Sequence, residues 1–198
     1  MTKPNDPDSK CKYSITPASI CEQLTQSAVE GRLILYCDEV CFTKHTNQGT
    51  DWSRLHMNIS VDQKAAFDAF KAVIAAISNE HGVAYCEIHD WAVTKVEFAD
   101  YLRALRKKFG QRPLCAFIDN LQSHRSPEVK VLAEELDIRL VYNKSHSFQY
   151  QPIEMVFSEV KAWYKKIKLN HLARGLEFDK DRAIKQAFDR VPLQHVKN

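Results

Sequence analysis

The sequence is poor in glycine and proline and has no long hydrophobic run. Five glycines and seven prolines in 198 residues exclude collagen-like and low-complexity character. No run approaches the ~20 apolar residues of a membrane-spanning helix, and the polar residues 1–6 do not begin a secretory signal peptide. These absences predict an intracellular protein without a membrane partner, in the nucleus of a eukaryote or in the cytoplasm or nucleoid of a bacterium.

Several familiar kinds of site are also missing. There is no glycine-rich phosphate loop, so no nucleotide cofactor is expected. The six cysteines include no Cys-x-x-Cys pair, and four of them lie in or beside apolar, strand-like runs. Buried, reduced thiols are therefore expected in place of disulfides or a zinc site. Serine, cysteine and histidine form no convincing nucleophile arrangement.

The composition that is present favours one folded domain. The chain is 44% hydrophobic and 27% charged, which is enough for a sizeable core. Its net charge of +3 is uneven, because residues 155–198 carry +5 and residues 1–154 carry −2. A basic end suits an anionic partner, although a solvated helix face also explains such a bias.

The hydrophobic pattern predicts an α/β protein with an early antiparallel pair of strands. Residues 1–30 are expected to form a polar tail with a short helix, residues 31–170 the main domain, and residues 171–198 a helical extension. The connection ending at Gly82 is typical of a hairpin, although residues 65–77 also fit a helix. A capping box of Thr94 and Glu97 starts one helix. Strands are expected at 32–37, 72–77, 83–88, 113–118 and 138–142, and the later helices at 94–109, 126–136, 153–169 and 177–191.

Three carboxylates follow or precede these elements at matching places. Asp38 is expected to end the first strand, Asp119 ends the fourth, and Glu154 opens the long helix after the fifth. The carboxyl ends of strands in an α/β sheet line its functional crevice. Acids that converge there require hard cations, and Mg²⁺ prefers oxygen ligands. Taken alone, an acid after a strand is most often a turn residue or a helix cap, and Glu154 early in its helix also suits the helix dipole.

Three sequence blocks carry a more specific signal. They are Leu35-Tyr36-Cys37-Asp38-Glu39, then Phe117-Ile118-Asp119-Asn120 with His124-Arg125-Ser126, and Gln151-Pro152-Ile153-Glu154 followed by Phe157 and Lys161. Residues 120–153, 34 in number, separate the second and third acids. The blocks resemble the DDE (Asp-Asp-Glu) superfamily of transposases and endonucleases, and in particular the mariner-type transposases and their bacterial insertion-sequence relatives.

The resemblance implies an RNase H-like fold, a five-stranded mixed sheet with elements in the order β-β-β-α-β-α-β-α and helices on both sides. It implies that Asp38, Asp119 and Glu154 are the catalytic residues and bind two Mg²⁺ ions, for which Mn²⁺ can substitute. The activity implied is phosphodiester hydrolysis and strand transfer at DNA ends. DNA is the partner, with a homodimer on DNA as one possible assembly.

The sequence departs from the family pattern at Gln151, where Asn is usual, at Phe148 and at Phe157. Residues 1–31 are too short for the helix-turn-helix modules that precede the catalytic core in this group, so a catalytic domain without its DNA-reading part is expected.

Side chains around the acids are candidates for binding DNA. An Asx turn with a surface histidine, or a solvated helix face, explains the same residues about equally well. Glu39 is expected to point away from Asp38, because side chains alternate along a strand. The expected DNA contacts are Asn120, His124, Arg125, Lys161, Lys165 and Lys168.

Two other functions remain open at this stage. One is a catalytically inactive or domesticated transposase-derived module that binds DNA without a divalent metal. The other is an α/β small-molecule binder, which requires the strand after Gly82 to run parallel to its neighbour and the three acids to lie apart.

Overall fold

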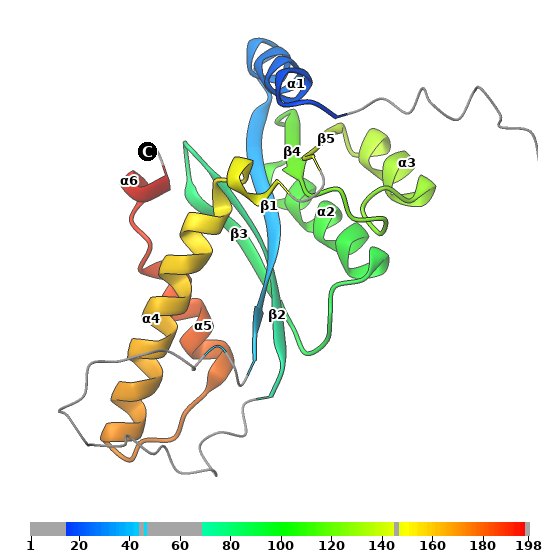
Figure 1. Ribbon diagram of the computed structural model, residues 1–198. Helices are drawn as coiled ribbons and strands as arrows, with labels where there is room; N and C mark the ends of the chain where they lie inside the picture. Colours follow the sequence, from blue (N-terminus) through cyan, green and yellow to red (C-terminus); the bar gives the residue numbers. More distant parts are fainter. Residues whose placement is uncertain (1–14, 44–45, 47–68, 145–146, 197–198) are drawn as a thin grey trace, which may run out of the picture.

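A computed structural model describes residues 15–43, 46, 69–144 and 147–196. The chain folds as a central sheet with helices on both faces (Figure 1). The elements are, in order, α1 (Pro17–Val29), β1 (Leu33–Phe42), β2 (Lys71–Ser78), β3 (Gly82–His89), α2 (Lys95–Phe109), β4 (Leu114–Ile118), α3 (Pro127–Glu135), β5 (Ile138–Tyr142), the 3₁₀ turn η4 (Phe148–Tyr150), α4 (Ile153–Ala173), α5 (Lys180–Asp189) and α6 (Leu193–Val196).

The five-stranded sheet is mixed, with the order β3-β2-β1-β4-β5. The strands β1, β2 and β3 pair antiparallel, whereas β4 and β5 add in parallel on the other side of β1. The predicted hairpin is therefore confirmed, and its antiparallel pairing contradicts the small-molecule-binder hypothesis. Periodicity did not separate strand from helix here because β2 is buried on both faces and shows no alternation.

The first strand is longer than the sequence predicts. The apolar run predicts an end at Cys37, but β1 continues to Phe42 and carries Asp38 within it. The reason is the pairing: β1 contacts β4 only as far as Tyr36, while its second half pairs with β2 from Tyr36 to Phe42. Pairing with β2 thus keeps Asp38 and Glu39 in the strand, although in the sequence these two charged residues look like a strand end.

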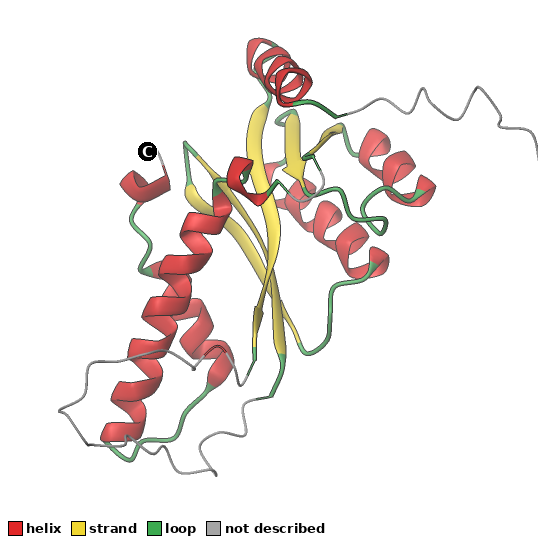
Figure 2. Ribbon diagram, in the orientation of Figure 1, coloured by secondary structure: helices red, strands yellow, loops and turns green. Residues whose placement is uncertain are grey.

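Helices cover both faces of the sheet (Figure 2). One hydrophobic core joins β1, β2 and β4 to α2 and α3, and it includes Leu35, Cys37 and Phe98. A second core joins the other face of β1 and β2 to α4 and α5, with Val40 and Phe42 facing it. The helix α1 packs through Ile20 against β4 and β5. Alternate residues of β1 therefore face opposite layers.

Local capping signals were reliable guides to helix ends. Thr94 and Glu97 form the predicted capping box of α2, and Gly110 ends this helix with φ +60°. The last predicted helix begins later than expected, at Lys180, where the Asp179 side chain caps it. No described helix combines the length and apolar character that crossing a bilayer requires. The described cysteines are free, as expected, but Cys21 and Cys41 are exposed, unlike the buried thiols predicted.

Candidate active site

Sheet pairing brings the first two acids together. The parallel register of β1 and β4 pairs Tyr36 with Phe117. Asp38 and Asp119 each lie two residues beyond this last pair, and the charge of Asp119 contributes to the raised pKa of Asp38, so the two lie close to one another. Asp119 comes directly after the last residue of β4. The two carboxylates therefore lie at one place in the sheet although 80 residues, 39–118, separate them in the chain.

The third acid, Glu154, lies in the first turn of α4. The side-chain amide of Gln151 donates a hydrogen bond to the backbone carbonyl of Cys37 at 3.1 Å. The backbone N–H of Glu154 in turn donates to the carbonyl of Gln151 at 3.2 Å. This connection ties the first turn of α4 to the residue that precedes Asp38, and Glu154 itself is exposed.

The charges of the three acids influence one another. Burial, with smaller contributions from the charges of Asp119, Glu154 and Glu39, raises the pKa of Asp38 to about 7, against the lowering effect of a hydrogen bond from the Glu39 N–H. In the described part of the chain, neither Asp38 nor Glu154 forms an ion pair with a lysine or arginine. Asp38 and Glu154 therefore have no basic partner among the described residues, whereas Asp119 is paired with His124.

The acids fit a divalent cation in chemistry. Among the described residues, no three histidine, cysteine or acidic side chains are already arranged as a ligand cluster. Carboxylate oxygens are, however, the ligands that Mg²⁺ and Mn²⁺ prefer. The raised pKa of Asp38 also reflects repulsion that a cation would relieve. Asp38, Asp119 and Glu154 are therefore the residues that would hold metal ions here.

His124 differs from its expected role. It is only 3% exposed, so it is not a surface histidine. Its Nδ1 lies 2.6 Å from Oδ1 of Asp119 and its Nε2 lies 3.2 Å from Oε1 of Glu39. Burial lowers the pKa of His124, but hydrogen bonds with Asp119 and Glu39 outweigh burial and raise it to about 9. With both nitrogens occupied, His124 is unsuited to the DNA contact predicted for it.

Glu39 lies on the opposite face of β1 from Asp38, in agreement with strand alternation, because it follows the parity of Leu35 and Cys37. It is nevertheless connected to Asp119 through His124. The sequence does not reveal this link between Glu39 and His124, because only the fold brings residues 85 positions apart into contact.

Two predicted DNA contacts lie next to the second acid. The Arg125 guanidinium donates to Oδ1 of Asn120 at 3.0 Å and lies over the Tyr142 ring at 5.9 Å from its centroid. Arg125 is exposed and Asn120 half-buried. Both remain candidates to contact a phosphate beside Asp119.

The three lysines of α4 do not share one environment. Lys161 and Lys165 are half-buried, whereas Lys168 is only 7% exposed and lies 5.6 Å from the centroid of the Phe178 ring. Helical spacing does not predict the burial of Lys168, because the chain after α4 folds back over the last turns of that helix. Lys168 therefore belongs to the interior and does not extend the DNA-facing row that the spacing predicted.

The sequence does not predict that two amides near the site, those of Asn143 and Gln151, are buried and hold the backbone. Asn143 follows β5, donates its side-chain N–H to the Ser147 carbonyl at 2.9 Å, and accepts from the Lys144 N–H at 2.8 Å. Gln151 is 3% exposed, and its Oε1 has no hydrogen-bond partner among the described residues. The sequence signal was present, since both amides flank the segment that leads to Glu154.

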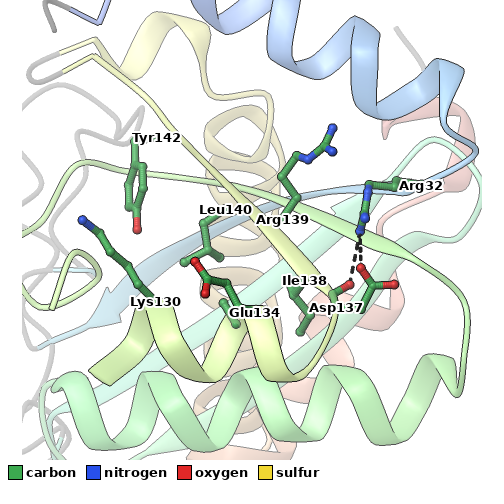
Figure 3. Close-up of a pocket in the computed structure, with 9 residues that line it drawn as sticks. Arg32, Lys130, Glu134, Asp137, Ile138, Arg139, Leu140 and Tyr142 are labelled. Atoms are coloured by element: carbon green, nitrogen blue, oxygen red, sulfur yellow. Dashed lines mark hydrogen bonds and ion pairs between the residues drawn. The ribbon is translucent and has the colours of Figure 1, made fainter. Parts of the chain in front are cut away.

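A cavity of about 480 Å³ lies elsewhere, along β5 and α3 (Figure 3). Two of its arginines form ion pairs: Arg32 contacts Asp137, which also lines the cavity, at 2.8 Å, and Arg139 contacts Glu30, which lies outside the lining, at 2.7 Å. None of the three acids lines it. The acids thus lie outside this cavity.

Comparisons with known proteins agree with this geometry. The family model for the DDE superfamily endonuclease matches residues 33–173. The chain therefore belongs to the DDE superfamily endonuclease family. A comparison with curated proteins gives no match.

Solved structures show the same fold. The crystal structure of the Mos1 strand transfer complex is 16% identical with a TM-score of 0.59, over 90% of this chain and 54% of that one. The catalytic domain of Mos1 mariner transposase is 15% identical with a TM-score of 0.57, over 90% of this chain and 82% of that one. The simian T-cell lymphotropic virus intasome in complex with PP2A regulatory subunit B56 gamma is 14% identical with a TM-score of 0.59, over 79% and 47%.

The fold is thus the RNase H-like fold of transposase and integrase catalytic domains. The chain spans about half the length of the first structures it matches.

Proposed function

We propose that this chain is a divalent-metal-dependent DNA endonuclease domain of the transposase type, which cleaves phosphodiester bonds and transfers strands at DNA ends. The observation that carries the proposal is the electrostatic influence of Asp119 and Glu154 on Asp38, since the charges of both contribute to the raised pKa of Asp38. The parallel pairing of β1 with β4 and the hydrogen bond from Gln151 to the Cys37 carbonyl support the same arrangement.

The role of the acids follows from their charge. Two divalent cations held by carboxylates stabilise the attacking and leaving oxygens of an in-line phosphoryl displacement. Asp38, Asp119 and Glu154 are the residues that would hold these ions. The absence of a lysine or arginine ion pair to Asp38 or Glu154 within the described residues leaves both carboxylates available.

The surroundings of the acids suit a polymer. Glu154 is exposed, and the acids lie outside the described cavities. Asn120 and Arg125 lie directly after Asp119, and Lys161 and Lys165 lie farther along the helix that begins at Glu154. Phosphate contacts from such residues position DNA without reading its sequence.

A nicking assay tests the proposal. Supercoiled plasmid and transposon-end DNA are incubated with the 198-residue chain in Mg²⁺, in Mn²⁺ and in EDTA. The wild type is expected to nick DNA with either metal and not in EDTA. Asp119→Ala is expected to abolish nicking, because it removes one of the three proposed metal ligands.

Asp100→Ala is the matched control, since Asp100 is an exposed acid on α2 whose ion pair with Arg103 is local. It is expected to retain wild-type nicking. Equal activity in Asp119→Ala and the wild type would refute the assignment. Salt-sensitive DNA binding with no response to metal would instead support the non-catalytic binding module.

A further inference from the structure

Asp119 contacts a buried histidine, His124, and the other nitrogen of that histidine contacts a fourth acid, Glu39. The imidazole of His124 lies between Asp119 and Glu39, with nitrogen–oxygen distances of 2.6 Å and 3.2 Å. Glu39 comes from β1 and His124 from the turn after β4. Glu39 has no function in the proposed chemistry as described so far.

The imidazole is fixed on every side. Carboxylates only accept hydrogen bonds, so both ring nitrogens serve as donors. The Phe98 ring packs against the imidazole with centroids 4.0 Å apart, and the Tyr142 hydroxyl donates to the backbone carbonyl of His124 at 3.2 Å. A ring that is 3% exposed and held in this way has one orientation.

The contact commits one specific oxygen of Asp119. The imidazole takes Oδ1, which also lies 3.4 Å from the Leu121 N–H. No hydrogen bond to Oδ2 occurs within the described residues. The hydrogen bond from the imidazole therefore constrains where Oδ2 points, and the Glu39 carboxylate holds the other nitrogen of that imidazole.

We propose that Glu39 is a positioning residue that acts through His124 on Asp119, so that Oδ2 of Asp119 is presented to a divalent cation. The inference rests on the proposed function, because it assigns Asp119 as a metal ligand. It goes beyond that function by adding a fourth carboxylate that touches neither metal nor DNA. Such outer partners orient metal ligands in many proteins, and their loss costs about 10–100-fold in metal affinity or activity.

The test compares two strand glutamates of similar exposure. Glu39→Gln removes the charge from the positioning residue, whose side chain is 21% exposed. Glu87→Gln is the control, because Glu87 on β3 is 24% exposed and also lies beside a histidine, His89, at 3.6 Å. Glu87 has no link to the three acids among the contacts of the described residues.

Two readouts are needed. Isothermal titration with Mn²⁺, in the absence of DNA, measures metal affinity independently of turnover, and plasmid nicking with Mg²⁺ measures activity. Glu39→Gln is expected to weaken Mn²⁺ binding and nicking about 10-fold or more. Glu87→Gln is expected to leave both within about twofold of the wild type.

A double-mutant cycle separates positioning from a general structural effect. His124→Asn retains a donor of similar reach to Asp119 but breaks the link to Glu39. In that background Glu39→Gln is expected to have no further effect, because the route through the imidazole is already gone. Additive losses would show that Glu39 does not act through His124 and would overturn the inference.

The remaining outcomes also decide the matter. Wild-type metal affinity and nicking in Glu39→Gln would overturn the positioning role while leaving the proposed function intact, and so would equal losses in Glu39→Gln and Glu87→Gln. A wild-type chain that neither binds Mn²⁺ nor nicks DNA would overturn the proposed function and the positioning role with it.

Discussion

Asp38 shows at the residue scale how a functional site opposes stability. It lies within a strand, half-buried, and its Oδ1 accepts from the Glu39 N–H at 2.7 Å. Burial and the neighbouring acids raise its pKa to about 7. Without a cation, ionising Asp38 in the folded protein therefore places a charge in surroundings that disfavour it.

Asp38→Asn is expected to stabilise the metal-free protein. The folded pKa of Asp38 exceeds its unfolded value, so ionisation of Asp38 destabilises the fold progressively between about pH 4 and pH 7 and fully above pH 7. The neutral amide removes this cost, and the free energy of unfolding is expected to rise by about 1–3 kcal/mol at pH 8, with solvent screening taken into account.

Urea unfolding in EDTA at pH 4 and pH 8 checks this prediction. The gain is expected to vanish at pH 4, where Asp38 is protonated in the folded state. Asp100→Asn, an exposed change on α2, is the control and is expected to alter stability little at either pH. A gain of equal size at both pH values would contradict an electrostatic origin.

At the scale of elements, the segment between β5 and α4 determines whether Glu154 reaches the other acids. Asn143 and Gln151 brace its two ends, and the Asn143 N–H also donates to the Ile118 carbonyl at 2.7 Å, next to Asp119. Hydrogen bonds therefore tie one end of the segment to Ile118, beside Asp119, and the other end to Cys37, beside Asp38.

Asn143→Ala is expected to lower the free energy of unfolding by about 1–3 kcal/mol, because it removes two hydrogen bonds of a side chain that is 4% exposed. Urea unfolding at pH 7 measures the loss. Asn79→Ala, in the exposed turn between β2 and β3, is the control and is expected to change stability by less than about 0.5 kcal/mol. Similar losses in the two variants would refute the bracing role of Asn143.

At the scale of the whole molecule, charge is divided along the chain. The acids gather where β1, β4 and α4 meet, while the basic excess lies in residues 155–198. The helix α4 links the two, since it begins beside the acids and carries Lys161 and Lys165.

Lysine substitutions on α4 are expected to separate DNA binding from stability. Lys161→Ala with Lys165→Ala is expected to weaken DNA binding and to reduce the slope of log affinity against log salt by about one for each phosphate that the variant no longer binds. Lys168→Ala is expected to leave this slope unchanged and to lower stability, because Lys168 is buried against Phe178. Fluorescence anisotropy with labelled DNA at several salt concentrations, alongside urea unfolding, checks both. Equal slopes in the double variant and the wild type would remove these two lysines from the DNA interface.

Much of the architecture follows from short-range sequence information. Apolar runs of strand length, helical periodicity and the Thr94–Glu97 capping box were sufficient for most elements, because these signals depend on neighbours a few residues apart. Residue types and the spacing of Asp119 and Glu154 were sufficient to propose Asp38, Asp119 and Glu154 as ligands of Mg²⁺.

Tertiary structure alone decided which long-range partners these residues have. Pairing with β2 carried β1 past Asp38, and the chain after α4 buried Lys168. The fold also joined Glu39 to Asp119 through His124. Such contacts depend on strand register and helix packing between distant segments, and no local pattern in the chain encodes them.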